Sequence, residues 1–587
     1  MSKLSRREFV YMMAVLGSAP VFANSHTRMT NTDRMEDYYK LKPFGNARLL
    51  HMTDSHAQLL PVYFREPSVN LGFYGNYGKP PHIVGEKLLD YYGIKGNKRL
   101  EYAYSCVDFE KHAKAIGRTG GFAQIKTVVD YLRNSFGEDK TLLMDGGDTW
   151  QGSATALYTR GKDMVGAMNK LGVDVAVGHW EFTYKANEVL ENVKELDAEF
   201  LAQNVKVKEM ALFDGAQAYD EYTGHAFKPY TIKKMGNARV AVIGQAFPYT
   251  TIANPQRFIP DWSFGINDEG MQELVNEIRE NEKPDAVIVL SHNGYDTDKK
   301  MAEVVTGIDF IMGGHTHDGV PEAYPVKNKQ GVTYVCNAGS NGKFLNVLDL
   351  DIQNGKIKDF KFTLLPIFSD LVPEDKEMKK YIQDVRAPFK KELTREIATT
   401  DETLFRRGNF NGSWDQIICD ALMEVKDAEI SLSPGFRWGT SVIPGQPITF
   451  DDLMTQTAMT YPETYRRDIS GKDIKLILED VADNLFNPDP FYQQGGDMVR
   501  TGKKKKKINP TAKMGERISD IQLTRNGQKL DPNKKYSVAG WSTVGAKSPG
   551  EPVWETVETY LTNVKHIQNL KVDTPDIIGV KGNPGIV

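Results

Sequence analysis

The chain is organised around the stretch LLMDGGDTWQG, residues 142–152. The apolar run 141–144 predicts a short buried strand, and the glycines of Asp145-Gly-Gly-Asp148 predict a turn directly after it. A carboxylate held on a glycine turn just beyond a strand is a common way to present a metal ligand. Asp148 by itself would prove little, because aspartate after a strand is also ordinary turn chemistry.

Four other predicted strands are also followed by aspartate or histidine. They cover residues 47–53, 174–177, 285–290 and 309–312, and they lead into DSH, GHWEF, SHN and GGHTH. Helices are predicted between the strands, at 119–136, 164–171, 186–196, 269–280 and 299–305. Strands that alternate with helices favour an α/β layered core, and in such cores sites lie at the carboxyl ends of the strands.

The side chains that follow these five strands are of metal-binding type. A core histidine or a turn aspartate taken singly is more often structural, but D-x-H, GGD, GH, SHN and GGH-x-H in one chain leave few structural explanations. We therefore predict two cations, roughly 3.5–4 Å apart, that share the carboxylate of Asp148. Mixed oxygen and imidazole ligation favours manganese, zinc or iron over magnesium and calcium. The predicted ligands are Asp54, His56, Asp148, His179, His292, His315 and His317.

Length and composition set the class of protein. At 587 residues the chain is too long for one core, so two domains with extensions are expected. Hydrophobic residues at 40% and charged residues at 26% are typical of a soluble globular protein, and a net charge of -4 gives no reason to expect nucleic acid or a membrane as a partner. Three widely spaced cysteines without a CxxC pair argue against a thiolate zinc site and a disulfide framework, although one bridge stays open.

The chain divides into four predicted parts. Residues 1–23 resemble a twin-arginine export signal, because Ser5-Arg6-Arg7-Glu8-Phe9 precedes an apolar run, 10–22, that is too short to span a bilayer. An ordinary secretory signal or an uncleaved anchor is the alternative, and export to the periplasm is the expected outcome. Residues 24–372 form the dimetal domain, 373–397 a charged, exposed linker helix, and 398–587 a second domain with its own strands and helices.

Two segments stand apart from this pattern. Residues 57–115 are rich in tyrosine, phenylalanine, glycine and proline, with one predicted helix at about 82–92. An irregular insertion of this length beside a site is more often functional than idle. The run of five lysines at 503–507 is predicted to be a solvated charge cluster, because blocks of like charge repel one another.

The order of the ligand motifs resembles the calcineurin-like metallophosphoesterases. Together with ISLSPGFR, residues 430–437, and PGQPITF, residues 444–450, it resembles the 5′-nucleotidase family over nearly the whole mature chain. The resemblance implies an α/β fold with a four-layer metallophosphoesterase-type β-sandwich core, flanking helices and a C-terminal 5′-nucleotidase-type α/β domain. It also implies one cation at Asp54, His56 and His317, a second at His179, His292 and His315, and Asp148 as the bridge.

The departures from that family concern the acid that protonates the leaving group. Where nucleotidases have GNHEFD, this chain has Gly178-His-Trp-Glu-Phe-Thr183, so that Trp180 replaces the catalytic histidine and Thr183 its partner aspartate. Loss of a general acid costs about 10²–10⁴-fold in rate for a leaving group that needs a proton. A thiolate or persulfide is a weak base and needs no such help.

The motifs GHWEFTY, PVYFREPSVNLG (61–72) and SPGFRWG (433–439) resemble the SoxB family of thiosulfohydrolases. This implies a dimanganese centre, with zinc as the alternative metal, that removes the terminal sulfonate from a cysteine S-thiosulfonate and releases sulfate. It also implies a partner, a sulfur-carrier protein with a C-terminal cysteine of the SoxYZ kind. Asp148 and Arg437 would be catalytic, and Arg437 and Trp180 would bind the substrate.

Two alternatives stay open. One is a periplasmic 5′-nucleotidase or related phosphoesterase, against which Trp180 and Thr183 argue. The other is a metal-dependent binding protein without turnover, against which the complete ligand set argues. In one place the chain departs from the thiosulfohydrolase pattern, because the lysines at 503–507 stand where a glycine-rich strand is expected, which puts that strand in doubt.

Overall fold

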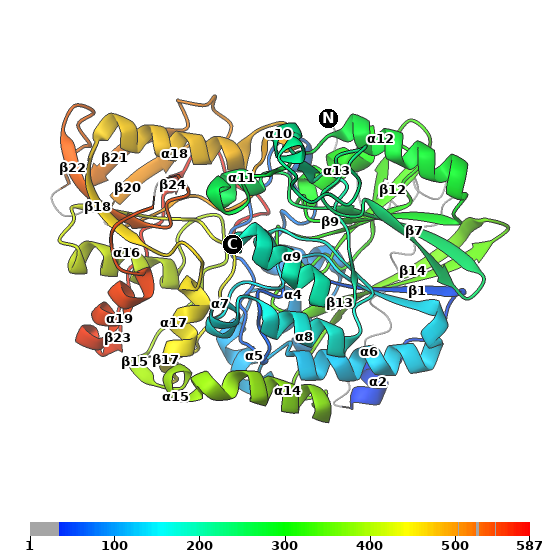
Figure 1. The fold of residues 1–587 in the computed structure, drawn as a ribbon. Coiled ribbons are helices and arrows are strands. Elements are labelled where there is room, and N and C mark those ends of the chain that lie inside the picture. Colours follow the sequence, from blue (N-terminus) through cyan, green and yellow to red (C-terminus); the bar gives the residue numbers. More distant parts are fainter. Residues whose placement is uncertain (1–33, 503, 524–526, 546) are drawn as a thin grey trace.

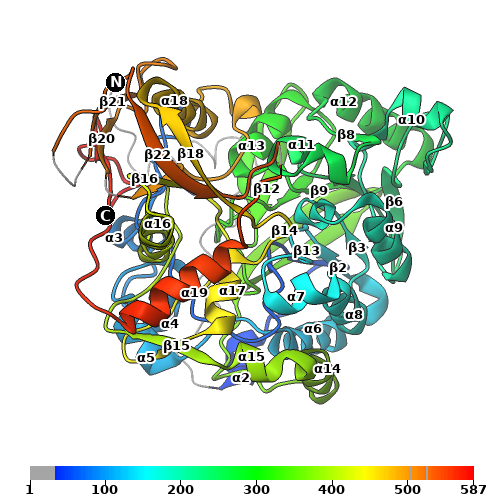
Figure 2. The same cartoon turned by 60° about the vertical axis from the view of Figure 1, so that its left-hand side comes forward.

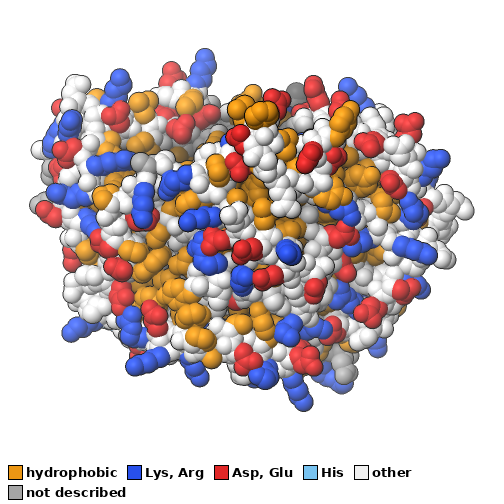
Figure 3. All heavy atoms as spheres, viewed as in Figure 1, with side chains coloured by type: hydrophobic (Ala, Val, Ile, Leu, Met, Phe, Trp, Pro, Cys, Tyr) orange, Lys and Arg blue, Asp and Glu red, His pale blue; other side chains and the backbone are white. Residues whose placement is uncertain are grey.

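The computed structural model describes residues 34–502, 504–523, 527–545 and 547–587. The predicted export signal, residues 1–23, lies outside the described residues. Within the described part of the chain, every helix is too short or too polar to cross a membrane. On the face in Figure 3, lysine and arginine side chains are interspersed with aspartate and glutamate, in keeping with the small net charge of -4.

Two six-stranded sheets form the core of the N-terminal region. The first has the order β14-β13-β1-β2-β3-β4, with β1 (Ala47–Met52), β2 (Thr141–Asp145), β3 (Val175–Ala176) and β4 (Glu199–Phe200) parallel and β13 (Phe344–Gln353) and β14 (Lys356–Pro366) antiparallel. The second has the order β11-β12-β10-β9-β7-β6. In it β12 (Val332–Asn337), β10 (Phe310–Gly313), β9 (Ala286–Ser291) and β7 (Ala238–Gln245) are parallel, between antiparallel β11 (Tyr324–Lys327) and β6 (Tyr230–Met235).

The sheets bury one face against each other and the other against helices. Val240 and Val242 of β7 belong to the core that the two sheets share, whereas Ala241 and Ile243 face a second cluster with α12 (Asp268–Glu277) and α13 (Tyr295–Val304). This is the period-two alternation of a strand buried on both faces. Helices α6 (Phe122–Phe136), α8 (Lys162–Leu171) and α9 (Ala186–Glu195) lie over the first sheet (Figure 1). The predicted four-layer α/β core is confirmed.

The insertion before α6 holds more helix than the sequence predicted. Besides α3 (Glu86–Tyr92), it contains α4 (Lys98–Tyr104) and α5 (Phe109–Ile116), so the expectation of a single helix was wrong. Helix α5 buries Phe109, His112, Ala113 and Ile116, which are the i, i+3, i+4 and i+7 positions of one helical face. The pattern was present in the sequence but was obscured by the polar residues between these positions.

The connection predicted as one exposed helix over 373–397 is broken. Helix α14 (Lys376–Arg386) ends before a 3₁₀ turn that contains Pro388, α15 (Lys390–Leu393) is a single turn, and strand β15 (Glu396–Thr400) begins within the predicted helix. Met378 and Ile382 of α14 are buried in the core of the first region, beside α6 and α8. The segment is therefore packed against the molecule on one side.

The C-terminal region is built around a smaller sheet. Its order is β18-β22-β16-β19, formed by β18 (Thr464–Ser470), β22 (Lys535–Trp541), β16 (Ile430–Ser433) and β19 (Arg500–Gly502). Helices α16 (Ser413–Val425), α17 (Phe450–Thr457) and α19 (Val553–Val564) share a core with one face, and α18 (Gly471–Phe486) packs on the other (Figure 2). A second α/β core of this kind was expected.

Residues 504–507 of the lysine run belong to a strand, and Lys506 is buried. Strand β20 (Lys504–Ile508) pairs with β21 (Ile518–Leu523), and the Lys506 Nζ donates to Thr501 Oγ1 at 2.8 Å. Burial lowers the pKa of Lys506 to about 8. The expectation of a wholly solvated cluster was therefore wrong for Lys506, because successive side chains of a paired strand point to opposite faces.

A buried ion pair links β1 to β13. The Arg48 guanidinium donates to both carboxylate oxygens of Asp349, at 2.6 and 2.9 Å, and both side chains are almost fully buried. We expect Asp349→Asn to lower the free energy of unfolding by about 3–5 kcal/mol, because it leaves the Arg48 charge buried without its partner. Denaturant unfolding measures this loss. The double variant Arg48→Met/Asp349→Leu should recover most of it, and equal losses in the single and double variants would contradict the role of the ion pair.

Candidate metal centre

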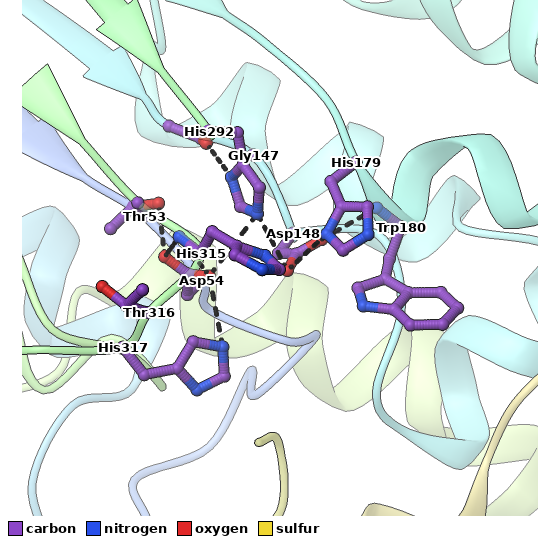
Figure 4. A network of polar contacts seen from close by, with 12 residues as sticks. Thr53, Asp54, Gly147, Asp148, His179, Trp180, His292, His315, Thr316 and His317 are labelled. Atoms are coloured by element: carbon purple, nitrogen blue, oxygen red, sulfur yellow. Dashed lines mark hydrogen bonds and ion pairs between the residues drawn. The ribbon is translucent and has the colours of Figure 1, made fainter. Parts of the chain in front are cut away.

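All seven predicted ligands lie at one edge of the two sheets. Asp54 and His56 follow β1, Asp148 follows β2 and His179 follows β3, so that four ligands come from the first sheet. His292 follows β9, and His315 and His317 follow β10, in the second sheet. Because the carboxyl ends of these parallel strands meet, the side chains converge (Figure 4).

The converging side chains form two buried clusters that share one residue. Asp148, His179, His292 and His315 make one cluster, and Asp54, His56, Asp148 and His317 make the other. In each cluster the potential ligand atoms lie within 4.8 Å of one another. The division of the ligands and the bridging position of Asp148 agree with the sequence prediction.

The contacts around Asp148 and Asp54 bring these ligands together. Asp148 Oδ2 lies 3.0 Å from His292 Nε2 and 3.3 Å from His179 Nδ1. In the other cluster, His317 Nε2 lies 3.2 Å from Asp54 Oδ1 and 3.0 Å from His56 Nε2. Figure 4 shows the imidazoles turned toward the two carboxylates.

Unpaired polar atoms and buried charge show that the residues fit two cations. Among the described residues, neither ring nitrogen of His315 has a hydrogen-bond partner, and His179 Nε2 and His317 Nδ1 also lack one, although all are buried. Burial lowers the pKa of His292, but the charges of Asp148 and Asp54 outweigh burial and raise it to about 10. The carboxylates therefore attract a proton where two cations would be held.

Contacts one step further out fix the direction of the rings. His292 Nδ1 meets the Gly146 carbonyl at 2.5 Å, and His56 Nδ1 meets the Gln151 carbonyl at 3.2 Å. Since a carbonyl only accepts, each Nδ1 carries the proton and each Nε2 is free for a metal. Five ligands, Asp54, His56, Asp148, His315 and His317, also have a positive φ, which is the kind of backbone strain that gathers at functional sites.

Glu181 holds the DGGD turn, a role that the sequence did not reveal. Its Oε1 accepts the backbone N–H groups of Thr149 and Trp150, at 2.6 and 3.1 Å, and its Oε2 accepts those of Asp148 and His179, at 3.1 and 2.8 Å. One buried carboxylate thus ties the bridging ligand of β2 to the ligand of β3. Asp145 stays within the turn, where it accepts from Gly147 N and the Thr149 hydroxyl.

An aromatic cavity opens onto the metal centre. It has a volume of about 410 Å³ and is lined by ligands of both clusters, by Trp180 and Arg437, and by side chains of the C-terminal region. Trp180 makes edge-on contacts with Phe436 and Trp438, at ring-centroid distances of 5.6 and 5.0 Å. The two residues predicted to bind substrate therefore lie beside the ligands.

Arg437 is held at the wall of this cavity. Its Nη2 donates to the Gly496 carbonyl at 2.9 Å, and its Nε lies 3.5 Å from Asp497 Oδ1. Its Nη1 is buried and lacks a hydrogen-bond partner among the described residues. Its side chain is only 11% exposed, so Arg437 is not a surface arginine.

Two further residues beside the ligands were missed from the sequence. Arg407 is buried and donates to the Thr316 carbonyl at 2.9 Å and to Asp318 Oδ1 at 3.1 Å. Phe247 follows β7 and stacks on the His315 ring at 4.2 Å. A phenylalanine after a strand resembles any core residue, and Arg407 lies in a stretch without a ligand motif, so neither carried a local signal. The three cysteines are buried and unbridged.

Known proteins share the fold of this chain. Residues 396–553 match the 5′-nucleotidase, C-terminal domain. The structure of sulfate thiohydrolase SoxB from Thermus thermophilus has a TM-score of 0.85 and 33% identity, and the match covers 92% of this chain and 98% of that one. A 5′-nucleotidase precursor, also from Thermus thermophilus, has a TM-score of 0.70 and 21% identity over 91% of this chain and 99% of that one.

The curated relatives include Protein UshA of Yersinia enterocolitica. It is 23% identical over 497 residues, which cover 75% of this chain and 84% of that protein. The fold and the paired Asp/His clusters define a two-metal hydrolase with a separate C-terminal domain. The chain belongs to the 5′-nucleotidase family.

The bridging role of Asp148 predicts a loss of metal on substitution. We expect Asp148→Asn to lower the metal content per chain as well as the rate, because both clusters lose the charge of their shared ligand. Elemental analysis of the purified variant measures the metal. Full occupancy of both positions in that variant would refute the bridge.

Substitution of Glu181 should lower the metal affinity only through the position of the ligands, because Glu181 is not itself a predicted ligand. In Glu181→Gln the amide nitrogen cannot accept a hydrogen bond, so two of the four backbone N–H groups lose their partner. We expect metal affinity to fall by about 10–100-fold, the usual range for an outer-shell partner. Competition with a chelator measures it. Glu191→Gln, at an exposed position of α9, is the matched control, and equal affinities in the two variants would contradict the role of Glu181.

Proposed function

We propose that the chain hydrolyses the terminal sulfonate of a cysteine S-thiosulfonate on a sulfur-carrier protein and releases sulfate. The observation that carries this proposal is Trp180, which stands where the family's catalytic histidine is expected and is enclosed by Phe436 and Trp438. Thr183, in the place of the partner aspartate, lies 2.7 Å from the Thr460 hydroxyl. An indole and a hydroxyl do not protonate a leaving group at neutral pH, so the site suits a leaving group that departs unprotonated.

Similarity supports the same substrate class. The solved structure of sulfate thiohydrolase SoxB is 33% identical to this chain, and the match covers 98% of that protein. The name of that protein includes sulfate, and the motifs GHWEFTY and SPGFRWG, which carry Trp180 and Arg437, are those that resemble the SoxB family.

The reaction is a hydrolysis at sulfur. Water and R–S–S–SO₃⁻ give R–S–S⁻, SO₄²⁻ and two protons: an S–O bond forms, the S–S bond to the sulfonate breaks, and the electron pair leaves on the persulfide. Two bound cations would supply a water molecule of lowered pKa and charge for the developing oxyanion. Manganese is our proposal for both, with zinc as the alternative, because the ligand set accepts either.

The residues of the chain bind and orient. Arg437 presents an unpartnered Nη1 beside the clusters, and a planar guanidinium suits two sulfonate oxygens. Trp180 and its aromatic neighbours exclude water from the space where the persulfide departs. Asp148 holds the two clusters together, and Glu181 holds Asp148.

The proposal also includes a partner protein and a compartment. The carrier would present its modified cysteine near its C-terminus, since a cavity of about 410 Å³ takes an extended chain end and not a folded surface. We propose the periplasm as the compartment, on the sequence of residues 1–23. Neither nucleic acid nor stable membrane association is part of the proposal.

One experiment separates the candidate functions. The metal-loaded protein is given a carrier that bears the S-thiosulfonate and, separately, AMP, and sulfate and phosphate are measured. We expect sulfate release and little phosphate. Rapid phosphate release without sulfate would refute the proposal in favour of a 5′-nucleotidase, and release of neither would favour a binding protein without turnover.

The variant Arg437→Lys tests whether the guanidinium of Arg437 binds the sulfonate group of the substrate. Lysine keeps the charge but loses the planar pair of donors, so we expect kcat/KM to fall by roughly 10–100-fold, the equivalent of one charged hydrogen bond. Steady-state sulfate release measures the loss, and metal content should stay at the wild-type level. Arg466→Lys, at an exposed position of β18, is the control. An unchanged kcat/KM in Arg437→Lys would remove the arginine from the site.

A further inference from the structure

A second cavity adjoins the metal centre at His315, beside the aromatic cavity. It has a volume of about 470 Å³ and lies between the start of α13, the segment after α18 and the insertion at residues 70–82. The function proposed above makes no use of it. About half of its lining surface is polar, with several charged side chains, whereas the lining of the cavity of about 410 Å³ is mainly apolar.

Cationic side chains outnumber acidic ones in the lining of this basic cavity. Six cationic side chains line it against three acidic ones, Asp296, Glu303 and Asp318, and two of the six, Lys300 and Arg437, also pair with Asp489 and Asp497 just outside it. Burial, and then the charge of Lys299, lowers the pKa of Lys79, so the two ammonium groups lie close enough to repel each other. Like charges that face one cavity favour an anion between them. The cationic residues are Lys79, Lys299, Lys300, Lys327, Arg407 and Arg437.

Buried donors in the same cavity lack acceptors. Arg407 Nε and Arg437 Nη1 have no hydrogen-bond partner among the described residues, although their side chains are only 3% and 11% exposed. His82 Nδ1 is also buried without a hydrogen-bond partner among the described residues, while the Nε2 of that ring contacts Asp296 at 2.9 Å. Buried guanidinium donors without acceptors are costly unless a ligand satisfies them.

The basic cavity and the aromatic cavity share one wall. His315, Arg437, Gly495 and Gly496 line both. Gly495 has a φ of +73° and lies so close to His315 that a Cβ atom would come within 1.8 Å of the ring Nε2. The shared wall therefore contains a glycine loop that packs on a predicted metal ligand, and Arg437 and Asn484 also line both cavities.

We propose that the basic cavity is a binding site for a tetrahedral oxyanion, which receives the anion formed at the metal centre while the aromatic cavity still holds the rest of the substrate. The proposal rests on the proposed function only in that the reaction forms such an anion. Sulfate from a thiosulfonate and phosphate from an ester have the same shape and charge class. Arg407, Arg437, Lys79 and Lys299 would donate to its oxygens.

Binding without turnover tests the site. The metal-loaded protein is titrated calorimetrically with sulfate, with phosphate and with chloride at equal ionic strength. We expect two sulfate ions per chain, one at the metals and one in the basic cavity, displacement of sulfate by phosphate, and no specific heat with chloride. In the double variant Lys79→Gln/Lys299→Gln, one of the two sulfate ions should bind at least tenfold more weakly. The metal content of this variant should be unchanged.

Further variants keep the result decisive. Lys79→Gln alone changes an exposed side chain that folding does not require, and it should weaken sulfate about threefold to fivefold. Lys162→Gln removes an exposed, ion-paired lysine of α8 and is the control. One sulfate per chain in the wild type, or wild-type affinity in the double variant, would overturn the proposal. Crystals soaked in selenate should show anomalous density beside Arg407, and density only at the metals would also overturn it.

The outcomes for the two proposals are separable. If the carrier is not hydrolysed but two oxyanions bind, the proposed function fails and the site stands. If the carrier is hydrolysed but Lys79→Gln/Lys299→Gln binds sulfate as the wild type does, the site fails and the function stands.

Discussion

The buried carboxylate of Asp148 is the constraint on which the centre depends. It lies between the imidazoles of His179, His292 and His56, with almost no access to water. A charge in that position is stable only if cations or protons compensate it. The glycine turn, the positive φ of the ligands and the four backbone donors to Glu181 all hold this group in place, and the two sheets bring the remaining ligands to it.

The C-terminal region completes the site. Arg437, Phe436 and Trp438 come from the segment after β16, and they face ligands that come from strands of the first region. Because this segment also touches the Gly495 loop, one wall of the C-terminal region borders both the aromatic and the basic cavity. Phe436, Arg437 and Trp438 are more than 100 positions away from the nearest candidate ligand in the chain, so only folding brings them to the site.

Much of the centre could be predicted, because each ligand follows a strand. A buried strand and a glycine turn are local patterns, and the edge where parallel strands end is common to all of them. Glu181, Arg407 and Phe247 could not be predicted in the same way. Their roles arise from contacts with residues distant in the sequence, such as Glu181 with Thr149 and Arg407 with Thr316. The helix at α5 was predictable from its spacing, and it was missed because its polar residues obscured the pattern.

The α/β class and the seven candidate ligands follow from residue type and short-range periodicity, which the linear order preserves. That Trp180 and Thr183 stand in place of an acid pair follows only from the resemblance to the 5′-nucleotidase motif. The tertiary structure decided which side chains support the ligands, that Lys506 is buried in β20, and that two cavities of opposite character meet at Gly495. Those features depend on which surfaces are brought together when the chain folds, and neither spacing nor composition records that.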